Sequence, residues 1–218
     1  MAKLVTICLT LVASGAWLLL AVWGEGGFVP FFADPARVAV IAVTFLLVIA
    51  SFFTQGNVSP GEKEDRGNRW VLIVFTVVGL LDGWLPAYSD RAGLLTFGGE
   101  GLRWVGVGLF GIGGVLRLWP VFVLGRRFSG LVAIQRDHQL VTDGIYRTIR
   151  NPSYLGLLIG VVGWALVFRS LLGLMLVALF VPALIGRIHS EERLLAGYFG
   201  PEYEGYRARS WRLIPYIY

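Results

Sequence analysis

Six long apolar runs constrain the fold of this chain more than any other feature of its sequence. They cover residues 4–23, 38–54, 70–86, 102–124, 152–168 and 171–188. Most approach the roughly 20 residues that an α-helix needs to cross the hydrocarbon core of a bilayer. Because lipid cannot satisfy the backbone groups of an open strand, these runs predict helices. We therefore predict an all-α integral membrane protein with about six transmembrane helices, the last two forming a C-terminal helical hairpin.

The run at 4–23 is long for the apolar core of a signal peptide and precedes no clear small-x-small cleavage site. We therefore expect it to be a retained span. The composition agrees, because only 15% of the residues are charged, whereas a soluble domain is nearer a quarter charged.

The distribution of Lys and Arg predicts the orientation. If the N-terminus is cytosolic, residues 1–3, 55–69, 125–150 and 187–218 are cytosolic too and hold 1, 3, 5 and 5 basic residues, or 14 of the 19. Cytosolic loops normally carry this excess. We expect both termini in the cytosol, and the net charge of +5 is explained by topology and anionic lipid. It does not require a nucleic-acid partner.

The cysteine and histidine content argues against a metal centre. Cys8 is the only cysteine, and His138 and His189 are the only histidines. The chain therefore has no disulfide framework and no thiolate cluster. A zinc or haem site would depend mostly on carboxylates, and we predict no metal.

A glycine pattern in the fourth run resembles a nucleotide fingerprint. Gly106, Gly108 and Gly111 fit G-x-G-x-x-G, but that fingerprint requires a strand before it and a helix after it. Within a membrane helix, small residues instead allow close approach of a neighbouring helix. We interpret these glycines, and Gly156 and Gly160, as packing positions.

Ionisable residues inside the apolar runs point to function. Arg117 lies about 15 residues from the predicted outer end of its helix, or roughly 22 Å deep. A charge at this depth faces the bundle interior or reaches the interface by snorkelling, and the sequence leaves both open. Asp82 is expected near the outer end of its helix, in reach of water. Arg187 and Glu191 are four residues apart, on one helix face, either as an exposed ion pair or at the same inner surface as Arg117.

Two inner segments, 125–150 and 189–212, are too long for simple connectors and mix aromatic, acidic and basic residues. We expect them to cap the bundle and enclose a polar site at the membrane surface. The predicted division is an N-terminal part, 1–101, with helices that carry no motif, and a core, 102–218, with one transmembrane helix, the 125–150 segment, the hairpin and a capping helix.

Three motifs stand out in the core, "HQLVTDGIYRTIRNPSYLG" (138–156), "EERLLAGYFGPEYEGY" (191–206) and "RLIP" (212–215). Together they resemble the isoprenylcysteine carboxyl methyltransferase family and its phospholipid methyltransferase relatives. Their order and spacing around a hairpin agree with the family pattern over roughly 138–215. Asn151 departs from that pattern, because the family has histidine before the proline. Asparagine cannot titrate, so we assign it no proton-transfer role.

The resemblance implies S-adenosylmethionine as methyl donor, bound without a Rossmann domain. Arg150 or His138 would hold the donor carboxylate through charge-assisted hydrogen bonds. Tyr146 and Tyr154 would face the sulfonium or the adenine, and Pro152 would bend the chain into the membrane. The complete set of expected cofactor-binding residues is His138, Leu140, Val141, Gly144, Tyr146, Arg150, Asn151, Pro152, Tyr154 and Glu192.

The resemblance also implies a lipophilic acceptor that arrives from the membrane. We expect Arg117 and Arg187 to hold an acceptor carboxylate and Glu191 to fix an arginine or the polar end of the donor. If the acceptor is an amine or thiol, a base is needed, and Glu191 is the candidate. The acceptor is expected to enter between the helix over 102–124 and one helix of the hairpin.

Two other functions remain open at this stage. One is an NADPH-dependent sterol-type membrane reductase, a group with a similar C-terminal core but larger size. The other is a non-enzymatic membrane module that retains only the fold. Binding of S-adenosylmethionine or of NADPH would discriminate the three.

Overall fold

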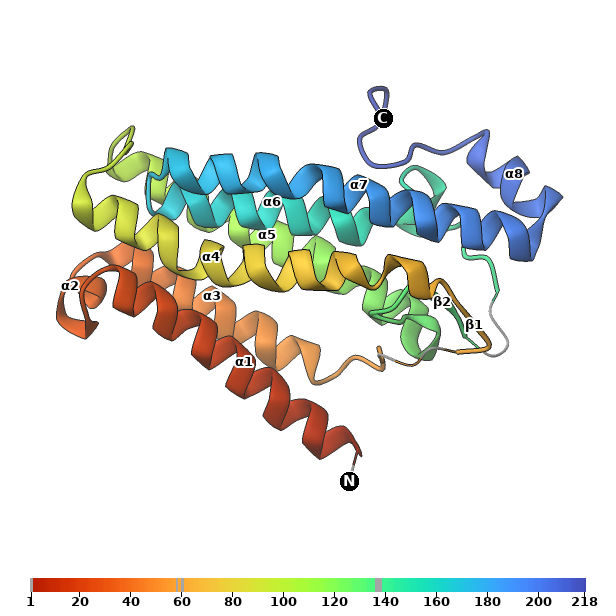
Figure 1. Ribbon diagram of the computed structural model, residues 1–218, viewed down its shortest axis with the longest axis horizontal. Helices are drawn as coiled ribbons and strands as arrows, with labels where there is room; N and C mark the ends of the chain where they lie inside the picture. Colours follow the sequence, from red (N-terminus) through yellow and green to blue (C-terminus); the bar gives the residue numbers. More distant parts are fainter. Residues whose placement is uncertain (1, 58, 60, 136–138) are drawn as a thin grey trace.

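The computed structural model describes residues 2–57, 59, 61–135 and 139–218, and shows an elongated bundle of long helices (Figure 1). The α-helices are α1 (Ala2–Gly24), α2 (Phe28–Phe32), α3 (Pro35–Ser51), α4 (Trp70–Ala92), α5 (Glu100–Leu124), α6 (Pro152–Val167), α7 (Leu171–Phe199) and α8 (Pro201–Arg207). The short 3-10 helices are η1 (Arg66–Asn68), η2 (Gly125–Arg127) and η3 (Gly144–Arg147).

The predicted fold class is confirmed, because each of the six apolar runs forms a helix. Four of these helices, α1, α4, α5 and α7, are long and apolar enough to cross a membrane. Helices α3 and α6 are shorter, with 17 and 16 residues. Both begin with a proline at the first helical turn, which suits that position because its missing N–H has no partner there. The chain is a multi-pass membrane protein.

Helix α4 is longer than predicted, and this changes the position of Asp82. The apolar run suggested an end near residue 86, but the helix continues to Ala92 and ends at Gly93, whose φ of 65° closes it. Pro86 lies inside this helix. Asp82 is therefore near the middle of the helix and only 4% exposed. The expectation that it reaches water is wrong.

Glycines bring α5 and α6 together along their length. A Cβ added to Gly106 or Gly113 of α5 would overlap the backbone of α6, and one at Gly156 or Gly163 of α6 would overlap the backbone of α5. The predicted close packing is confirmed at Gly106 and Gly156, whereas a Cβ at Gly108 or Gly160 would meet nothing within 4 Å. This contact closes the α5–α6 interface, so it leaves no entry path there for a lipid.

A buried ion cluster holds together the end of the bundle that carries α2. Asp90 accepts hydrogen bonds from Arg37 Nη2 (2.9 Å), Arg103 Nη1 (2.6 Å) and Arg169 Nη2 (2.8 Å). Arg37 Nη1 also lies 3.1 Å from Glu25 Oε2. Three arginines that the sequence places in or beside outer loops thus fix α3, α4, α5 and the turn after α6 at one point.

The opposite end carries the non-helical elements (Figure 1). Strands β1 (Lys63–Glu64) and β2 (Ala133–Ile134) form an antiparallel pair with Lys63 opposite Ile134. The sequence did not predict this pair, which is too short for a recognisable strand pattern. It ties the 55–69 loop to the 125–150 segment. After α8 the chain turns back, and the C-terminus lies beside α7 (Figure 1).

Candidate functional site

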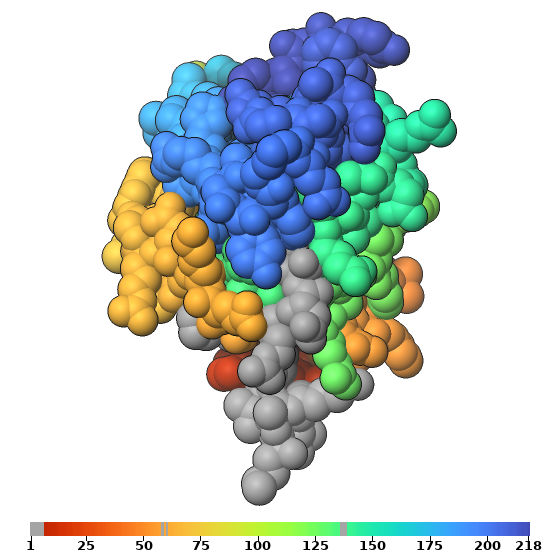
Figure 2. Space-filling model, turned by 90° about the vertical axis from the view of Figure 1, so that its right-hand side faces the viewer, coloured from red at the N-terminus to blue at the C-terminus, as the bar shows by residue number. Residues whose placement is uncertain are grey.

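A cavity opens at the end of the bundle where the two inner segments meet. Its walls come from the end of α5, the 127–134 chain, the 139–154 segment and the second half of α7. Figure 2 views this end of the molecule, where the blue α7–α8 region lies beside the green 140s segment. The prediction that these segments cap the bundle and enclose a polar site is confirmed by their position.

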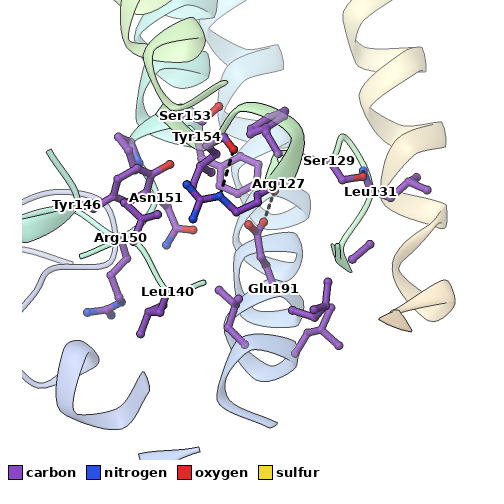
Figure 3. Close-up of a pocket in the computed structure, with 18 of the residues that line it drawn as sticks. Arg127, Ser129, Leu131, Leu140, Tyr146, Arg150, Asn151, Ser153, Tyr154 and Glu191 are labelled. Atoms are coloured by element: carbon purple, nitrogen blue, oxygen red, sulfur yellow. Dashed lines mark hydrogen bonds between the residues drawn. The ribbon is translucent and has the colours of Figure 1, made fainter. Parts of the chain in front are cut away.

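Most of the predicted site residues line this one cavity. They are Arg117, Leu140, Val141, Tyr146, Arg150, Asn151, Pro152, Tyr154, Arg187 and Glu191. Figure 3 shows Tyr154 and Glu191 between Tyr146, Arg150 and Asn151 on one side and Ser129 and Leu131 on the other. Gly144 and Glu192 are not among the lining residues. His138 lies outside the described residues.

A chain of three polar side chains crosses the membrane side of the cavity. Arg187 Nε donates to the Tyr154 hydroxyl (2.8 Å), and that hydroxyl donates to Glu191 Oε2 (2.7 Å). Arg187 Nη2 also donates to the Gly130 carbonyl at 2.5 Å. Arg187 and Tyr154 are buried, at 5% and 8% exposed. Because Arg187 and Glu191 lie on one face of α7, the tyrosine from α6 joins both charges and fixes their positions.

Arg117 reaches the same cavity from α5. Its Nη1 donates to Ser153 Oγ at 2.7 Å, and its guanidinium lies 6.0 Å from the centre of the Tyr154 ring. The side chain therefore faces the bundle interior and does not snorkel to the outer surface. Arg117 and Arg187 thus approach the cavity from two helices, on either side of Tyr154.

A second ion network forms the wall behind the cavity. Glu192 accepts hydrogen bonds from Arg150 Nε (3.0 Å) and Arg212 Nε (2.9 Å), and Asn151 Nδ2 donates to the Arg212 carbonyl (3.0 Å). Arg150 Nη1 also donates to the Arg207 carbonyl at 3.1 Å. We call Arg150, Asn151, Glu192 and Arg212 the C-terminal clamp. It locks the segment before α6 to the C-terminal tail.

The C-terminal clamp changes the interpretation of two predicted donor contacts. Glu192 is 6% exposed and is used by two guanidinium groups, so in this structure it supports the wall and does not face the cavity. Arg150 lines the cavity, but its Nε and Nη1 hold Glu192 and the tail. Asn151, where the family has histidine, acts as a neutral hydrogen-bond donor in the same network.

Three tyrosines give the cavity its aromatic wall. Burial raises the pKa of Tyr146 and of Tyr203 above its ordinary value, and raises the pKa of Tyr206 to about 12. These phenols therefore stay neutral at physiological pH. The Tyr206 hydroxyl donates to the Tyr146 carbonyl at 2.8 Å, which joins α8 to the 139–154 segment.

Several lining residues were missed by the sequence interpretation. Tyr203 and Tyr206 lie in the motif "EERLLAGYFGPEYEGY", so the signal was present, whereas the 127–134 chain carries no motif. Ser153 follows the motif proline and gives no sign of its contact with Arg117. The missed lining residues that this site uses most are Arg127, Ser129, Gly130, Ser153, Leu194, Leu195, Tyr203 and Tyr206. Among the described residues, no group of three or more His, Cys, Asp or Glu side chains could hold a metal ion.

The part of the chain that carries most of the site is similar to a known protein family. Residues 102–202 match the family model described as phospholipid methyltransferase. This range includes most of α5, the 125–150 segment, α6 and α7, and ends before Tyr203. The resemblance that the sequence motifs predicted, to isoprenylcysteine carboxyl methyltransferases and their phospholipid methyltransferase relatives, is confirmed.

Curated proteins that the chain resembles include several named protein-S-isoprenylcysteine O-methyltransferase. The chain is 37% identical over 114 residues to the protein-S-isoprenylcysteine O-methyltransferase of Schizosaccharomyces pombe, covering 51% of this chain and 48% of the relative. It is 34% identical over 109 residues to protein-S-isoprenylcysteine O-methyltransferase B of Arabidopsis thaliana, covering 49% and 55%. These matches span only about half the length of the curated relatives.

A solved structure extends the comparison of folds to nearly the whole chain. The eukaryotic intramembrane Ras methyltransferase, an isoprenylcysteine carboxyl methyltransferase, superposes with a TM-score of 0.55 at 22% identity. The superposition covers 99% of this chain and 75% of that one. At this identity the likeness concerns the fold.

Proposed function

We propose that this chain is an S-adenosylmethionine-dependent methyltransferase that methylates the carboxylate of a lipophilic, prenylcysteine-like acceptor within the membrane. The observation that carries the proposal is the joining of Arg187 and Glu191 through Tyr154, with Arg117 beside them, in a cavity built by the segments that match the family model.

The lining suits the donor. S-adenosylmethionine has an aromatic base, ribose hydroxyls, a zwitterionic amino-acid end and a sulfonium cation. Neutral tyrosines offer ring faces to the base or the sulfonium, and Leu140 and Val141 add apolar surface. The remaining donors of Arg150, and His138, would hold the carboxylate. When bound, the donor supplies an electrophilic methyl group.

The acceptor side depends on two arginines. A carboxylate between Arg117 and Arg187 would receive charge-assisted hydrogen bonds from two helices. Glu191, held through Tyr154, limits the excess positive charge and keeps Arg187 aimed at the acceptor. A carboxylate needs no base, so the contribution of these residues is to fix its oxygen in line for attack and to keep water out. The acceptor's apolar chain would remain in hydrocarbon.

The Lys and Arg distribution supports a cytosolic location for both termini and for the cavity. The division into residues 1–101 and 102–218 remains a prediction. It agrees with the family match, which begins at residue 102.

The test uses purified full-length protein in detergent. Isothermal titration with S-adenosylmethionine should show binding, and titration with NADPH should not. Protein incubated with methyl-labelled donor and N-acetyl-S-prenylcysteine should then form a base-labile methyl ester. Binding of NADPH alone would replace the proposal with the reductase, and binding of neither would leave the non-enzymatic module.

The position of Glu191 supports a second candidate, methylation of an amine head group. Its carboxylate lines the cavity beside Arg187, where it is placed to take a proton from an amine. The family description, phospholipid methyltransferase, favours the same alternative. A labelled-methyl assay with phosphatidylethanolamine as acceptor, in place of the prenylcysteine, distinguishes the two.

A further inference from the structure

A second, mostly apolar chamber lies deeper in the bundle. Four helices, α4, α5, α6 and α7, contribute to its lining, including Phe75, Val78, Leu157 and Phe180. Its volume is about 150 Å³, and an apolar cavity of about that size in another protein holds a benzene molecule. The chamber therefore has room for part of a lipophilic ligand.

This chamber adjoins the candidate site. Arg117 lines both spaces. Phe75 connects them as well, because the Arg187 guanidinium lies 5.9 Å from its ring centre and the Phe180 ring lies 4.4 Å from it on the chamber side. A molecule whose polar head lies between Arg117 and Arg187 could extend directly into the chamber.

Besides Arg117, one other charged residue type lines this apolar space, the carboxylic acid Asp82. Asp82 is 4% exposed, lines the chamber, and its Oδ1 is buried with no hydrogen-bond partner among the described residues. Its backbone carbonyl accepts from Trp164 Nε1 at 2.7 Å, which fixes this point of α4 against α6. A buried polar atom without a partner is costly, and an intramembrane carboxyl that retains such an atom is a candidate for function.

The helix contacts limit the distance between Asp82 and Arg117, which lies beside the proposed position of the polar head. A Cβ on Gly156 of α6 would meet the backbone of Arg117, and Trp164 of the same helix meets Asp82. The two levels are eight residues apart on α6, or about 12 Å. The Asp82 side chain leans toward the start of α4, and so toward Arg117. The separation of the two groups is therefore at most about 12 Å along the bundle.

We propose that Asp82 is a specificity-determining residue that binds a hydroxyl group carried on the apolar chain of the acceptor. The preferred ligand is an amphiphile with an anionic head and a hydroxyl on its chain, on the order of 12 Å from the head. That this ligand is methylated rests on the proposed function. That it binds beside Asp82 does not depend on that function.

The kinetic test compares two prenylcysteine acceptors that differ only by a hydroxyl on the chain. Wild-type protein should favour the hydroxylated acceptor about tenfold in KM, the effect of one hydrogen bond to a carboxyl group. Asp82→Leu should bring the ratio of the two KM values close to one, and Asp82→Asn, which keeps an acceptor oxygen, should restore most of the preference. Thr76→Val is the matched control, because it removes an exposed hydroxyl from the same helix. An unchanged ratio in Asp82→Leu overturns the proposal.

A binding test separates this inference from the proposed activity. A diazirine-bearing alkyl alcohol and the corresponding diazirine alkane are photolysed with the full-length protein, and the labelled residues are mapped by mass spectrometry. The alcohol should label α4 and α7 around Phe75 and Phe180, and Asp82→Leu should reduce that labelling to the level of the alkane. Equal labelling by both probes in wild-type protein would refute the role of Asp82, whether or not methyl transfer is observed.

Discussion

Replacing Tyr154 by phenylalanine isolates the part of the site that holds the acceptor. The change deletes one oxygen and retains the ring. That oxygen accepts from Arg187 Nε at 2.8 Å and donates to Glu191 Oε2 at 2.7 Å. Without it, the guanidinium keeps its bond to the Gly130 carbonyl but loses its link to the carboxylate. The aromatic face that is available to the donor remains.

The size of the effect follows from the bonds that are lost. A hydrogen bond to a charged group contributes about 1.5–3 kcal/mol. If the loss of the Arg187 bond is expressed in the transition state, kcat/KM for the acceptor falls by about 10- to 150-fold, because each 1.36 kcal/mol is tenfold in rate. Donor affinity should stay within about threefold of wild type, since the ring contact is unchanged.

The assay measures methyl transfer and donor titration on the same preparations. Tyr198→Phe is the control, because Tyr198 lies on α7, is 44% exposed and does not line the cavity. Tyr154→Ala should in addition weaken donor binding, since it removes the ring. If Tyr154→Phe retains more than about a third of wild-type kcat/KM, or loses donor affinity as strongly as transfer, Tyr154 does not position Arg187 for the acceptor.

Three further predictions concern the two ends of the bundle. Arg187→Lys should lose methyl transfer and keep donor affinity, because lysine lacks the planar fork that binds a carboxylate. The control Arg193→Lys, at an exposed position on the same helix, should leave both unchanged. Equal loss of methyl transfer and donor affinity in Arg187→Lys would place Arg187 in the donor pocket. Glu192→Ala should lower the free energy of unfolding by about 3 kcal/mol, because it leaves the largely buried guanidinium groups of Arg150 and Arg212 without their shared carboxylate. The corresponding fall in Tm is roughly 6–12 °C, measured by thermal melting in detergent. Burial raises the pKa of Glu25 to about 7, against the opposing effect of Arg37. Between about pH 4.5 and 7 the folded state therefore holds a proton that the unfolded state has lost, so the free energy of unfolding should decrease as pH rises through that interval. The decrease should be smaller in Glu25→Gln.

The sequence was sufficient for the fold class because hydrophobic length is a local property. Each predicted apolar run forms a helix, and Gly106 and Gly156 pack as expected. The end of α4 was not predictable in the same way. The polar residues after Pro86 resemble a loop in sequence, but Asp90 is neutralised by three arginines that come from α3, α5 and the turn after α6. Only the assembled bundle supplies those partners.

The candidate site shows the same limit. The motifs identified Tyr154 and Glu191, the four-residue spacing to Glu191 identified Arg187, and the structure brings the three together. The sequence could not show that Glu192, adjacent to Glu191, points away from the cavity into the C-terminal clamp. Successive helical residues lie about 100° apart around the axis, so one glutamate of the pair faces the cavity and the other the tail. Which one does so depends on where Arg150 and Arg212 lie.

Buried charged residues with all their hydrogen bonds made hold this bundle together, whereas those that lack partners are candidates for function. Asp90 receives guanidinium groups on both oxygens, so no acceptor capacity remains for a ligand, and its role is to hold helices. Asp82 has the opposite character, because its buried Oδ1 has no hydrogen-bond partner among the described residues. Native proteins rarely leave such an atom without a use. Arg117 lies between these cases, since Ser153 takes one nitrogen while the side chain lines two cavities. Asp82 is a polar group retained at a cost beside the space where a lipophilic ligand would lie. Selectivity among acceptors should therefore be sought at Asp82.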